Sequence, residues 1–461
     1  MAENLEKVSL FGCESLHQLH PSILSLPKLR YLILSGCKEI ESLNVHSKSL
    51  NVLRLRGCSS LKEFSVTSEE MTHLDLSQTA IRALLSSMLF LLKLTYLYLS
   101  GCREIESLSV HIKSLRVLTL IGCSSLKELS VTSEKLTVLE LPDTAIFALP
   151  TSIGHLLSLK ELDLCGTNIE LLPASIKILS MLKVLWLNDC RKLVSLQELP
   201  PSLSELYLND CCKLVSLPEL PPSVKEVSAF NCISLETDIT QDLVLQHMLQ
   251  SRIPYIHQQY LYNPAYFDDG YFIFPLGDHV TDLCRFRTAE SSITIPSLPK
   301  SQLRGYVSVI ILSKGPVSDH QFSCSIHRDD ILIGSDRRRF IGCENLISDH
   351  VLFWYHNASK FCGTGEVYDP FSNMTFIFAD INGNKDTIKG CGVFPVYGTE
   401  SGFKLVSSSS NEIFDNESEP RAKEVGVESC NNENEENCEQ LFRTKRRRTA
   451  CDNLPAITSS V

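Results

Sequence analysis

The sequence predicts an α/β repeat solenoid with a parallel β-sheet on its concave face, followed by an all-β sandwich and a disordered tail. Three observations predict this fold class. A leucine pattern recurs every 21 to 24 residues as far as Cys232, short β-prone runs follow from about residue 262 to residue 405, and the remaining segment is polar and acidic. A chain of 461 residues is long enough for two or three structural units.

The recurring pattern is Leu-x-x-Leu-x-Leu-x-x-Cys or Thr, and it occurs eleven times between Leu5 and Cys232. This pattern and its period define leucine-rich repeats, so residues 1–235 are expected to form a leucine-rich-repeat solenoid. A longer duplication lies on top of it: residues 29–93 align without gaps to residues 94–158, as GCKEIESLNVHSKSL and GCREIESLSVHIKSL show. A block that is duplicated intact is expected to stack.

Each repeat is expected to point its leucines inward from a short strand, while the Cys or Thr at position nine bonds the turning backbone. Loops or short helices should form the convex side, and the proline-rich segments 198–203 and 219–224 favour irregular crossings there. The cysteines that end the pattern are therefore predicted to be buried packing residues, not a disulfide or zinc framework. They are Cys13, Cys37, Cys58, Cys102, Cys123, Cys190, Cys211 and Cys232.

Beyond the repeats the composition changes in three steps. Residues 236–261 are expected to form a connecting or capping helix, because apolar residues recur at helical spacing after Thr237. Residues 262–405 contain the β-prone runs YFIF, SSITI, GYVSVIIL, QFSCSI, VLFWY, MTFIF and CGVFPVY, which predict an antiparallel sandwich or jelly roll. Residues 406–461 are predicted to be a disordered acidic tail.

Positions three, five and seven of each repeat must point away from the leucine core, so they are predicted to form the binding surface on the concave face. Six of them are aromatic, and rigid aromatic rings bury a large area at low entropic cost in protein interfaces. The predicted ligand-binding residues are Tyr31, Arg54, Arg56, Asp75, Tyr96, Tyr98, Glu161, Asp163, Trp186, Tyr207 and Phe230, with Ile33, Glu140 and Glu226 at equivalent positions. The alternative is that they are tolerated surface residues.

Catalytic and cofactor functions lack their minimal motifs. The sequence contains no phosphate loop, no HExxH, no GxSxG and no kinase signature, so we expect no enzyme, no cofactor and no metal. Asp380, Asn382 and Asn384 resemble the opening of a calcium loop, but Cys391 occupies the place of the required glutamate, and a hairpin turn at Asn382-Gly383 is the preferred interpretation. An enzyme in residues 262–405 would depend on the histidines there, and these show no motif spacing. They are His279, His320, His327, His350 and His356.

Charge and hydropathy limit the partners and the compartment. A net charge of −11 argues against nucleic acid, and no stretch is long and apolar enough to span a membrane. The absence of a secretory signal and the reduced thiols predict the cytoplasm or the nucleus. The basic cluster Lys445, Arg446, Arg447 and Arg448 is either a nuclear-import signal or part of a solvated tail.

These motifs together resemble the C-terminal half of plant intracellular nucleotide-binding leucine-rich-repeat receptors of the Toll/interleukin-receptor class. The repeats LRYLILSGC and LNVLRLRGC and the segment TAIFALPTSI at 144–153 carry the first part of the resemblance. The second part is carried by Phe274-Pro275-x-Gly277, SSITI, SDHVLFWY and IKGCGVFPVY, which resemble the C-terminal jelly-roll/Ig-like domain of that class. The resemblance covers about residues 5–405.

The resemblance implies that solenoid and sandwich jointly contact a protein ligand, either a pathogen effector or a modified host protein, and so release an oligomerising receptor from autoinhibition. Two departures bear on this. The segment DHVTDLCRF after Gly277 lacks the family's Pro-x-Trp-Phe-like stretch, and the signalling and nucleotide-binding domains are absent, which suggests a fragment with a bare hydrophobic end. The alternatives are a substrate adaptor of a ubiquitin ligase, or a truncated decoy that binds protein without signalling.

Overall fold

The protein is represented by a computed structural model. It describes residues 4–24, 26–84, 88, 91–237, 240, 242–248, 270–277, 286–296, 303–316, 321–339, 345–357, 372–380, 383, 385–399 and 402–405. The chain divides into two units, Met1–Ser410 and Asn411–Val461. The predicted acidic tail and the basic cluster Lys445–Arg448 lie outside the described residues.

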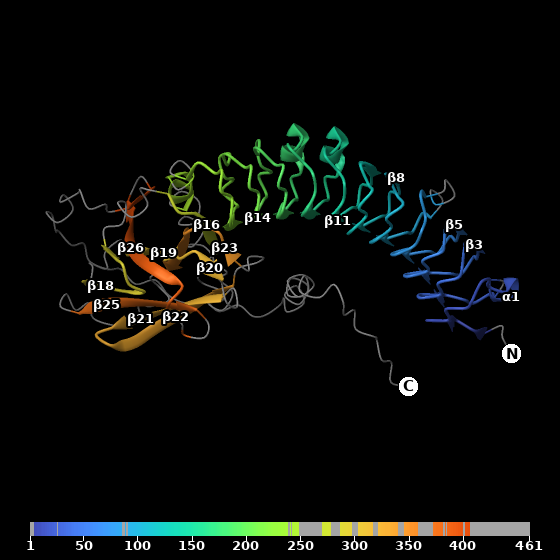
Figure 1. Ribbon diagram of the computed structural model, residues 1–461, viewed down its shortest axis with the longest axis horizontal. Coiled ribbons are helices and arrows are strands. Elements are labelled where there is room, and N and C mark those ends of the chain that lie inside the picture. Colours follow the sequence, from blue (N-terminus) through green and yellow to red (C-terminus); the bar gives the residue numbers. More distant parts are fainter. Residues whose placement is uncertain are drawn as a thin grey trace, which may run out of the picture. The chain divides into compact units, whose positions relative to one another are not determined.

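Eleven three-residue strands, one from each predicted repeat, pair side by side in parallel register (Figure 1). They are β1 Lys7–Ser9, β2 Tyr31–Ile33, β4 Val52–Arg54, β6 His73–Asp75, β7 Tyr96–Tyr98, β9 Val117–Thr119, β11 Val138–Glu140, β12 Glu161–Asp163, β13 Val184–Trp186, β14 Glu205–Tyr207 and β15 Glu226–Ser228. The central leucines share one interior: Leu32, Leu53, Leu97 and Leu118 are all fully buried. The leucine-rich-repeat solenoid is thus confirmed, because no single turn could bury these side chains alone.

The position-nine cysteines bond backward along the stack. The thiol of Cys123 donates to the carbonyl of Leu99 at 3.1 Å, and the same bond recurs at Cys37, Cys58, Cys102, Cys190, Cys211 and Cys232. Threonine at this position instead bonds within its own turn, as Thr144 does to Leu141 at 2.9 Å. Cys13 contradicts the prediction of burial, because it is exposed and no described turn precedes it to cover the thiol.

Position eight of every repeat has a left-handed backbone. Six of these residues are glycines, which adopt positive φ without steric cost. The other five are Gln78, Asp143, Asp189, Asp210 and Asn231, with φ between 56° and 62°. The backbone therefore turns sharply between the strand and the Cys or Thr in each repeat, and asparagine and aspartate are the side chains that tolerate this conformation best.

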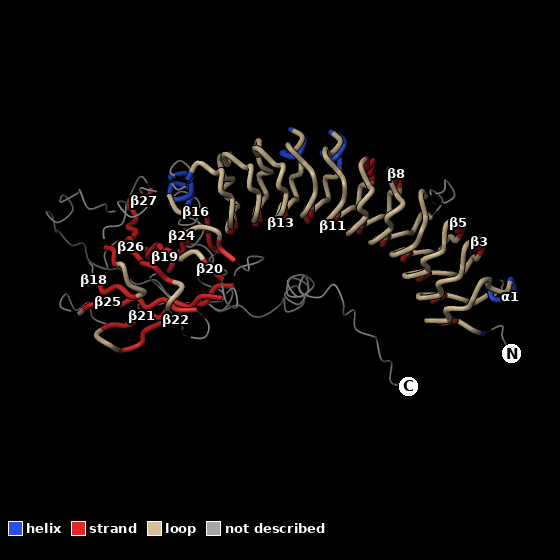
Figure 2. The backbone as a smooth tube through the Cα atoms, viewed as in Figure 1, coloured by secondary structure: helices blue, strands red, loops and turns tan. Residues whose placement is uncertain are grey.

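The outer side of the solenoid contains more strand than predicted (Figure 2). Strands β3 Ser42–His46 and β5 Glu63–Thr67 form one parallel pair, and β8 Ser107–His111 and β10 Glu128–Thr132 form a second pair in the duplicated block. Their alternating exposed and buried side chains explain why they form. Elsewhere the outer side has short helices: α1 Pro21–Leu24, η3 Thr151–His155 and η4 Ala174–Ile178.

The β-rich part consists of two antiparallel sheets. One contains β16 Tyr271–Pro275, β24 His350–Asn357, β19 Leu303–Leu312 and β26 Ile388–Thr399, with β17 Phe286–Thr288 and β27 Gly402–Leu405 also paired to β26. The other has the order β18 Ser292–Pro296, β25 Asn373–Asp380, β21 Gln321–Arg328 and β22 Ile331–Arg339. Side chains from both sheets, among them Trp354 and Phe376, share one core. A short ribbon of β20 Gly315–Pro316 and β23 Asn345–Leu346 completes the described strands.

The seven predicted β-prone runs all form strands, but one predicted turn is wrong. Asn382-Gly383 was expected to close a hairpin, whereas this segment joins β25 in one sheet to β26 in the other. Asn382 itself lies outside the described residues. A true two-residue hairpin connects β21 to β22 through Asp329 and Asp330, which have φ values of 46° and 69°.

The solenoid sheet continues directly into the β-rich part. Strand β16 pairs in parallel with β15, with Val227 opposite Phe272, so the edge of the last repeat is covered. Residues 242–248 are helical and bury Val244 and Met248 in the same core as the leucines. A hydrogen bond of 2.9 Å joins His247 Nε2 and the carbonyl oxygen of Val224. The repeats are thus closed by both a strand and a helix.

Candidate protein-binding surface

Parallel register arranges the outward side chains of the concave strands in two columns. Position three runs from Tyr31 through Val52 and beyond, while position five runs from Ile33 through Arg54 and beyond. Neighbouring side chains in a column are about 4.8 Å apart along the sheet. Residues that are 21 to 24 positions apart in the sequence therefore lie side by side on one surface.

An aromatic cluster occupies the surface between β6 and β7. The rings of His73 and Tyr96 stack with centroids 4.3 Å apart and an interplanar angle of 20°. Tyr98 lies 6.4 Å from Tyr96 with its ring nearly parallel. All three side chains are half-buried, so the rings are held in place while part of each faces solvent. His73 was not among the predicted site residues, although it occupies position three of its repeat.

Burial and the nearby Arg54 guanidinium lower the pKa of His73. Arg54 is exposed on β4 and is the register partner of Asp75 on β6, while Arg56 is half-buried two residues further. Asp75 accepts a hydrogen bond from the backbone N–H of Ser77 at 3.0 Å. This end of the surface therefore combines flat aromatic rings with two guanidinium groups.

From β11 onward the same positions carry carboxylates. They are Glu140, Glu161, Asp163, Glu205 and Glu226 at positions three and five, and Asp143, Asp189 and Asp210 at position eight. Trp186 and Tyr207 stack within this region with centroids 6.1 Å apart. The concave face is thus basic and aromatic near β4 to β7, and acidic from β11 to β15.

Three predicted site residues, and Glu226 at an equivalent position, are not exposed. Tyr207 is fully buried, and its hydroxyl lies 2.8 Å from a carboxylate oxygen of Glu205 and 2.8 Å from one of Glu226, with one proton to donate between them. Phe230 is buried in the core between the two β-sheets and lies 5.8 Å from the ring of His350. Asp163 is buried and accepts a hydrogen bond from the backbone N–H of Cys165. Tyr207 and Phe230 cannot act as surface anchors in this structure, whereas Tyr31, Tyr96, Tyr98 and Trp186 retain exposed area.

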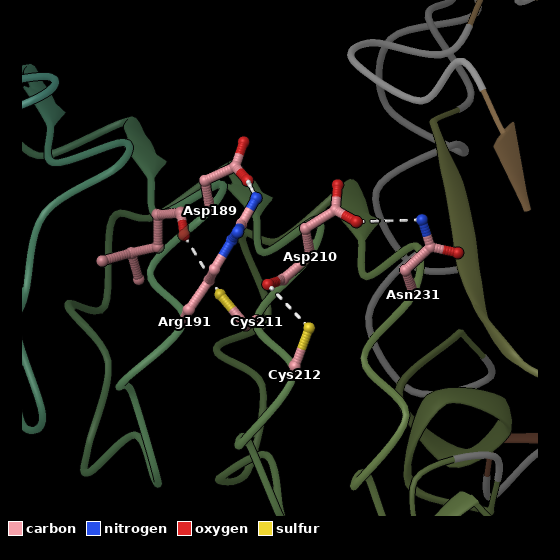
Figure 3. Close-up of polar contacts among 7 residues, drawn as sticks. Asp189, Arg191, Asp210, Cys211, Cys212 and Asn231 are labelled. Atoms are coloured by element: carbon pink, nitrogen blue, oxygen red, sulfur yellow. Dashed lines mark hydrogen bonds and ion pairs between the residues drawn. The ribbon is translucent and has the colours of Figure 1, made fainter. Parts of the chain in front are cut away.

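A hydrogen-bond network around Asn231 joins the last repeat to the β-rich part, and Figure 3 shows its bond to Asp210 of the preceding repeat. Its side-chain amide donates to Asp210 Oδ1 at 2.9 Å and to the carbonyl of Asn345 at 3.1 Å, and its Oδ1 accepts from the backbone N–H of Ile347. Burial raises the pKa of Asp210, while the bond from Asn231 opposes that shift. Asn231 therefore connects both parts of Met1–Ser410 through polar contacts that sequence spacing could not indicate.

The described part of the chain offers little support for a metal site, a membrane-spanning helix or a histidine-based active site. Among those residues, no group of three or more His, Cys, Asp or Glu side chains is arranged to hold a metal ion. No helix in the described ranges has the length and apolarity that a membrane crossing requires. His350 and His356 are fully buried and lie on one β-strand, while His279 and His320 fall outside the described residues.

Comparison with known proteins identifies relatives of the chain. No family model matches the chain. Over 202 residues the chain is 32% identical to the TMV resistance protein N of Nicotiana glutinosa. This match covers 44% of this chain and 15% of that protein. Over 214 residues it is 34% identical to the disease resistance-like protein DSC1 of Arabidopsis thaliana, covering 43% of this chain and 14% of that protein. The chain is similar to plant disease resistance proteins. It spans only a small part of the length of these relatives.

The solved structures that match the chain have lower sequence identity. The leucine-rich-repeat domain of the type III effector XopL is 20% identical with a TM-score of 0.25, and the match covers 45% of this chain and 67% of that one. A leucine-rich-repeat protein of Leptospira interrogans is 14% identical with a TM-score of 0.23, covering 50% and 73%. An internalin of Listeria monocytogenes is 16% identical with a TM-score of 0.17, covering 49% and 82%.

Proposed function

We propose that this chain is the ligand-recognition part of an intracellular plant immune receptor, which binds a pathogen effector or a modified host protein through its concave face. The observation that carries the proposal is the aromatic cluster of His73, Tyr96 and Tyr98, which stands partly exposed on a sheet held rigid by a continuous leucine core. Rigid rings on a preorganised surface lose little entropy when a partner covers them.

Similarity to two plant disease resistance proteins supports the biological setting of the proposal. The described cysteines are free thiols, which agrees with a reducing compartment. On this proposal the β-rich part is a jelly-roll/Ig-like domain, and the chain binds without catalysing a reaction. Signalling then belongs to other parts of an oligomerising receptor.

The proposal is tested by affinity purification with the full chain as bait. Tyr96→Ala, Tyr98→Ala and Trp186→Ala are combined in one variant, and its fold is checked by circular dichroism. Because these side chains face outward, the variant should fold normally yet lose its captured partners. Exposed side chains on the outer strands, such as Ser42 and Ser107, provide the control substitutions to Ala. If every partner is retained by the triple variant, the concave face is not the binding surface.

A further inference from the structure

Two arginines, Arg54 and Arg56, lie at positions five and seven of one concave repeat. Elsewhere on the solenoid, several lysines and arginines pair with a carboxylate one repeat away, as in Lys38–Glu14 at 2.8 Å and Lys93–Glu70 at 2.6 Å. The pairs Arg82–Glu104, Lys113–Glu134, Lys127–Glu106 and Lys177–Glu198 follow the same rule. Within the described residues, the guanidinium groups of Arg54 and Arg56 form no ion pair, although Asp75 is the register partner of Arg54.

Comparing the two duplicated blocks shows which positions are the same in both copies and which differ. Residues 59–69 and 124–134 differ only at Phe64 and Leu129, so the outer strand of this repeat is nearly unchanged. The concave positions of the same repeat differ, since Thr119 and Ile121 stand where the first copy has Arg54 and Arg56. Strands β4 and β9 have the same length and central leucine, so the fold accepts either pair of side chains. The two arginines are therefore not required for folding.

The arginines lie beside the aromatic cluster. Strands β4, β6 and β7 are consecutive in the sheet, which places Arg54 within about 10 Å of the β7 tyrosines. His73 lies between them and stacks on Tyr96. Two guanidinium groups beside stacked rings suit a partner segment that offers carboxylates around an aromatic side chain, because carboxylates accept bidentate hydrogen bonds from arginine.

We propose that Arg54, Arg56, His73, Tyr96 and Tyr98 form a subsite for an acidic segment of the protein ligand. This inference rests on the proposed function and specifies the chemistry of the partner at one end of the concave face. A polyanion that followed the whole surface, such as a nucleic acid, would meet the carboxylates Glu161 and Glu205 further along and be repelled. A protein segment needs to be acidic only where it contacts the arginines.

The test uses the full chain and two labelled synthetic peptides, one with glutamates flanking a tyrosine and one with lysines in their place. Fluorescence anisotropy should show binding of the acidic peptide, weakened as ionic strength rises from about 0.05 to about 0.5 M. Arg54→Thr with Arg56→Ile, which copies the second block, should lower the affinity about tenfold or more. The affinity for the lysine peptide should not fall.

The control variant Lys38→Thr with Lys127→Thr removes the same charge from the outer surface and should leave the acidic-peptide affinity within about twofold, since exposed charges at a distance are screened. If Arg54→Thr with Arg56→Ile alters the thermal unfolding curve, Arg54→Gln with Arg56→Gln replaces it. Equal binding by wild type and variant, no binding to wild type, or tighter binding of an oligonucleotide of equal charge overturns the inference. The proposed function still stands if the triple aromatic variant loses its captured partners.

Discussion

The backbone N–H of Asn231 donates a hydrogen bond of 3.0 Å to Nε2 of His350, which lies 119 residues further along the chain. The other ring nitrogen, Nδ1, lies 2.8 Å from the carbonyl oxygen of Ser348 and donates to it. Both contacts are satisfied only by a neutral imidazole that carries its proton on Nδ1. The junction between the last repeat and strand β24 therefore depends on the protonation state of one ring.

Acid should weaken the fold through this histidine. Burial lowers the pKa of His350 to about 4, whereas the pKa of an unfolded histidine is about 6.5. The unfolded state thus binds the extra proton between these values. The stability that the neutral ring provides is complete above about pH 6.5 and is lost as the pH falls toward 4, by on the order of 3 kcal/mol. Denaturant unfolding at a series of pH values measures it.

The matched control for this experiment is His350→Gln, which keeps a donor and an acceptor but does not titrate. Asp349 also titrates near the junction, but its ion pair with Lys389 lowers the pKa of that carboxyl, so its contribution is lost at lower pH. The difference between wild type and His350→Gln should therefore shrink as the pH is lowered from 7 to about 4. A constant difference would show that His350 does not carry the effect.

Replacing Asn231 with aspartate should destabilise the junction by about 2 kcal/mol. Aspartate keeps the left-handed backbone, as Asp189 and Asp210 do at the same position of the two preceding repeats. It loses the amide that donates to Asp210 and to the carbonyl of Asn345, and it adds a like charge beside Asp210. The free energy of unfolding measures the cost. Part of the loss should disappear at high salt, and a loss indifferent to salt would contradict the charge repulsion.

The position-nine thiols should resist alkylation in the folded protein. Burial raises the pKa of Cys123 and of Cys190 to about 12, so almost no thiolate exists at neutral pH. Cys13 is exposed and should be labelled by iodoacetamide under the same conditions. Mass spectrometry of peptides before and after unfolding in guanidinium distinguishes the two classes. Labelling of Cys123 as fast as Cys13 in the native state would contradict the buried position.

The need for a left-handed backbone at position eight can be tested at a glycine where an added side chain would meet no other atom. Gly122 has φ of +71°, and a Cβ added there would meet no atom within 4 Å. Gly122→Ala should therefore cost about 1 kcal/mol through backbone conformation alone, and Gly122→Asn should cost less. Thermal unfolding of both variants makes the comparison. Equal costs would mean that the left-handed backbone is not the cause.

The solenoid could be predicted in detail because every repeat buries its leucines in the same way. Leu32, Leu53, Leu97 and Leu118 recur at one period, and burial at that period allows only one register. The outer strands β3 and β5 were missed, although the alternation in SLNVH and EFSVT was a usable signal. The leucine pattern predicts the structure of the concave side but not the secondary structure of the outer segment of each repeat.

The candidate site was predicted less well, for a physical reason. Periodicity shows which side chains leave the leucine core, but not whether another part of the chain covers them. Phe230 follows the outward pattern yet packs between the β-sheets beside His350. Its burial depends on contacts with residues more than 100 positions away, which no local pattern encodes. His73 could have been found, since it sits at position three between predicted site residues.

The exchange of Arg54 and Arg56 for Thr119 and Ile121 within two nearly identical blocks also bears on how such a protein changes over time. Tyr31 and Tyr96 begin corresponding strands 65 residues apart, so removing one block would join strands of matching register without opening the interior. Unequal recombination between the blocks could therefore lengthen or shorten the array while new side chains appear on its inner surface. The scaffold can vary what it recognises at little risk to its ability to fold.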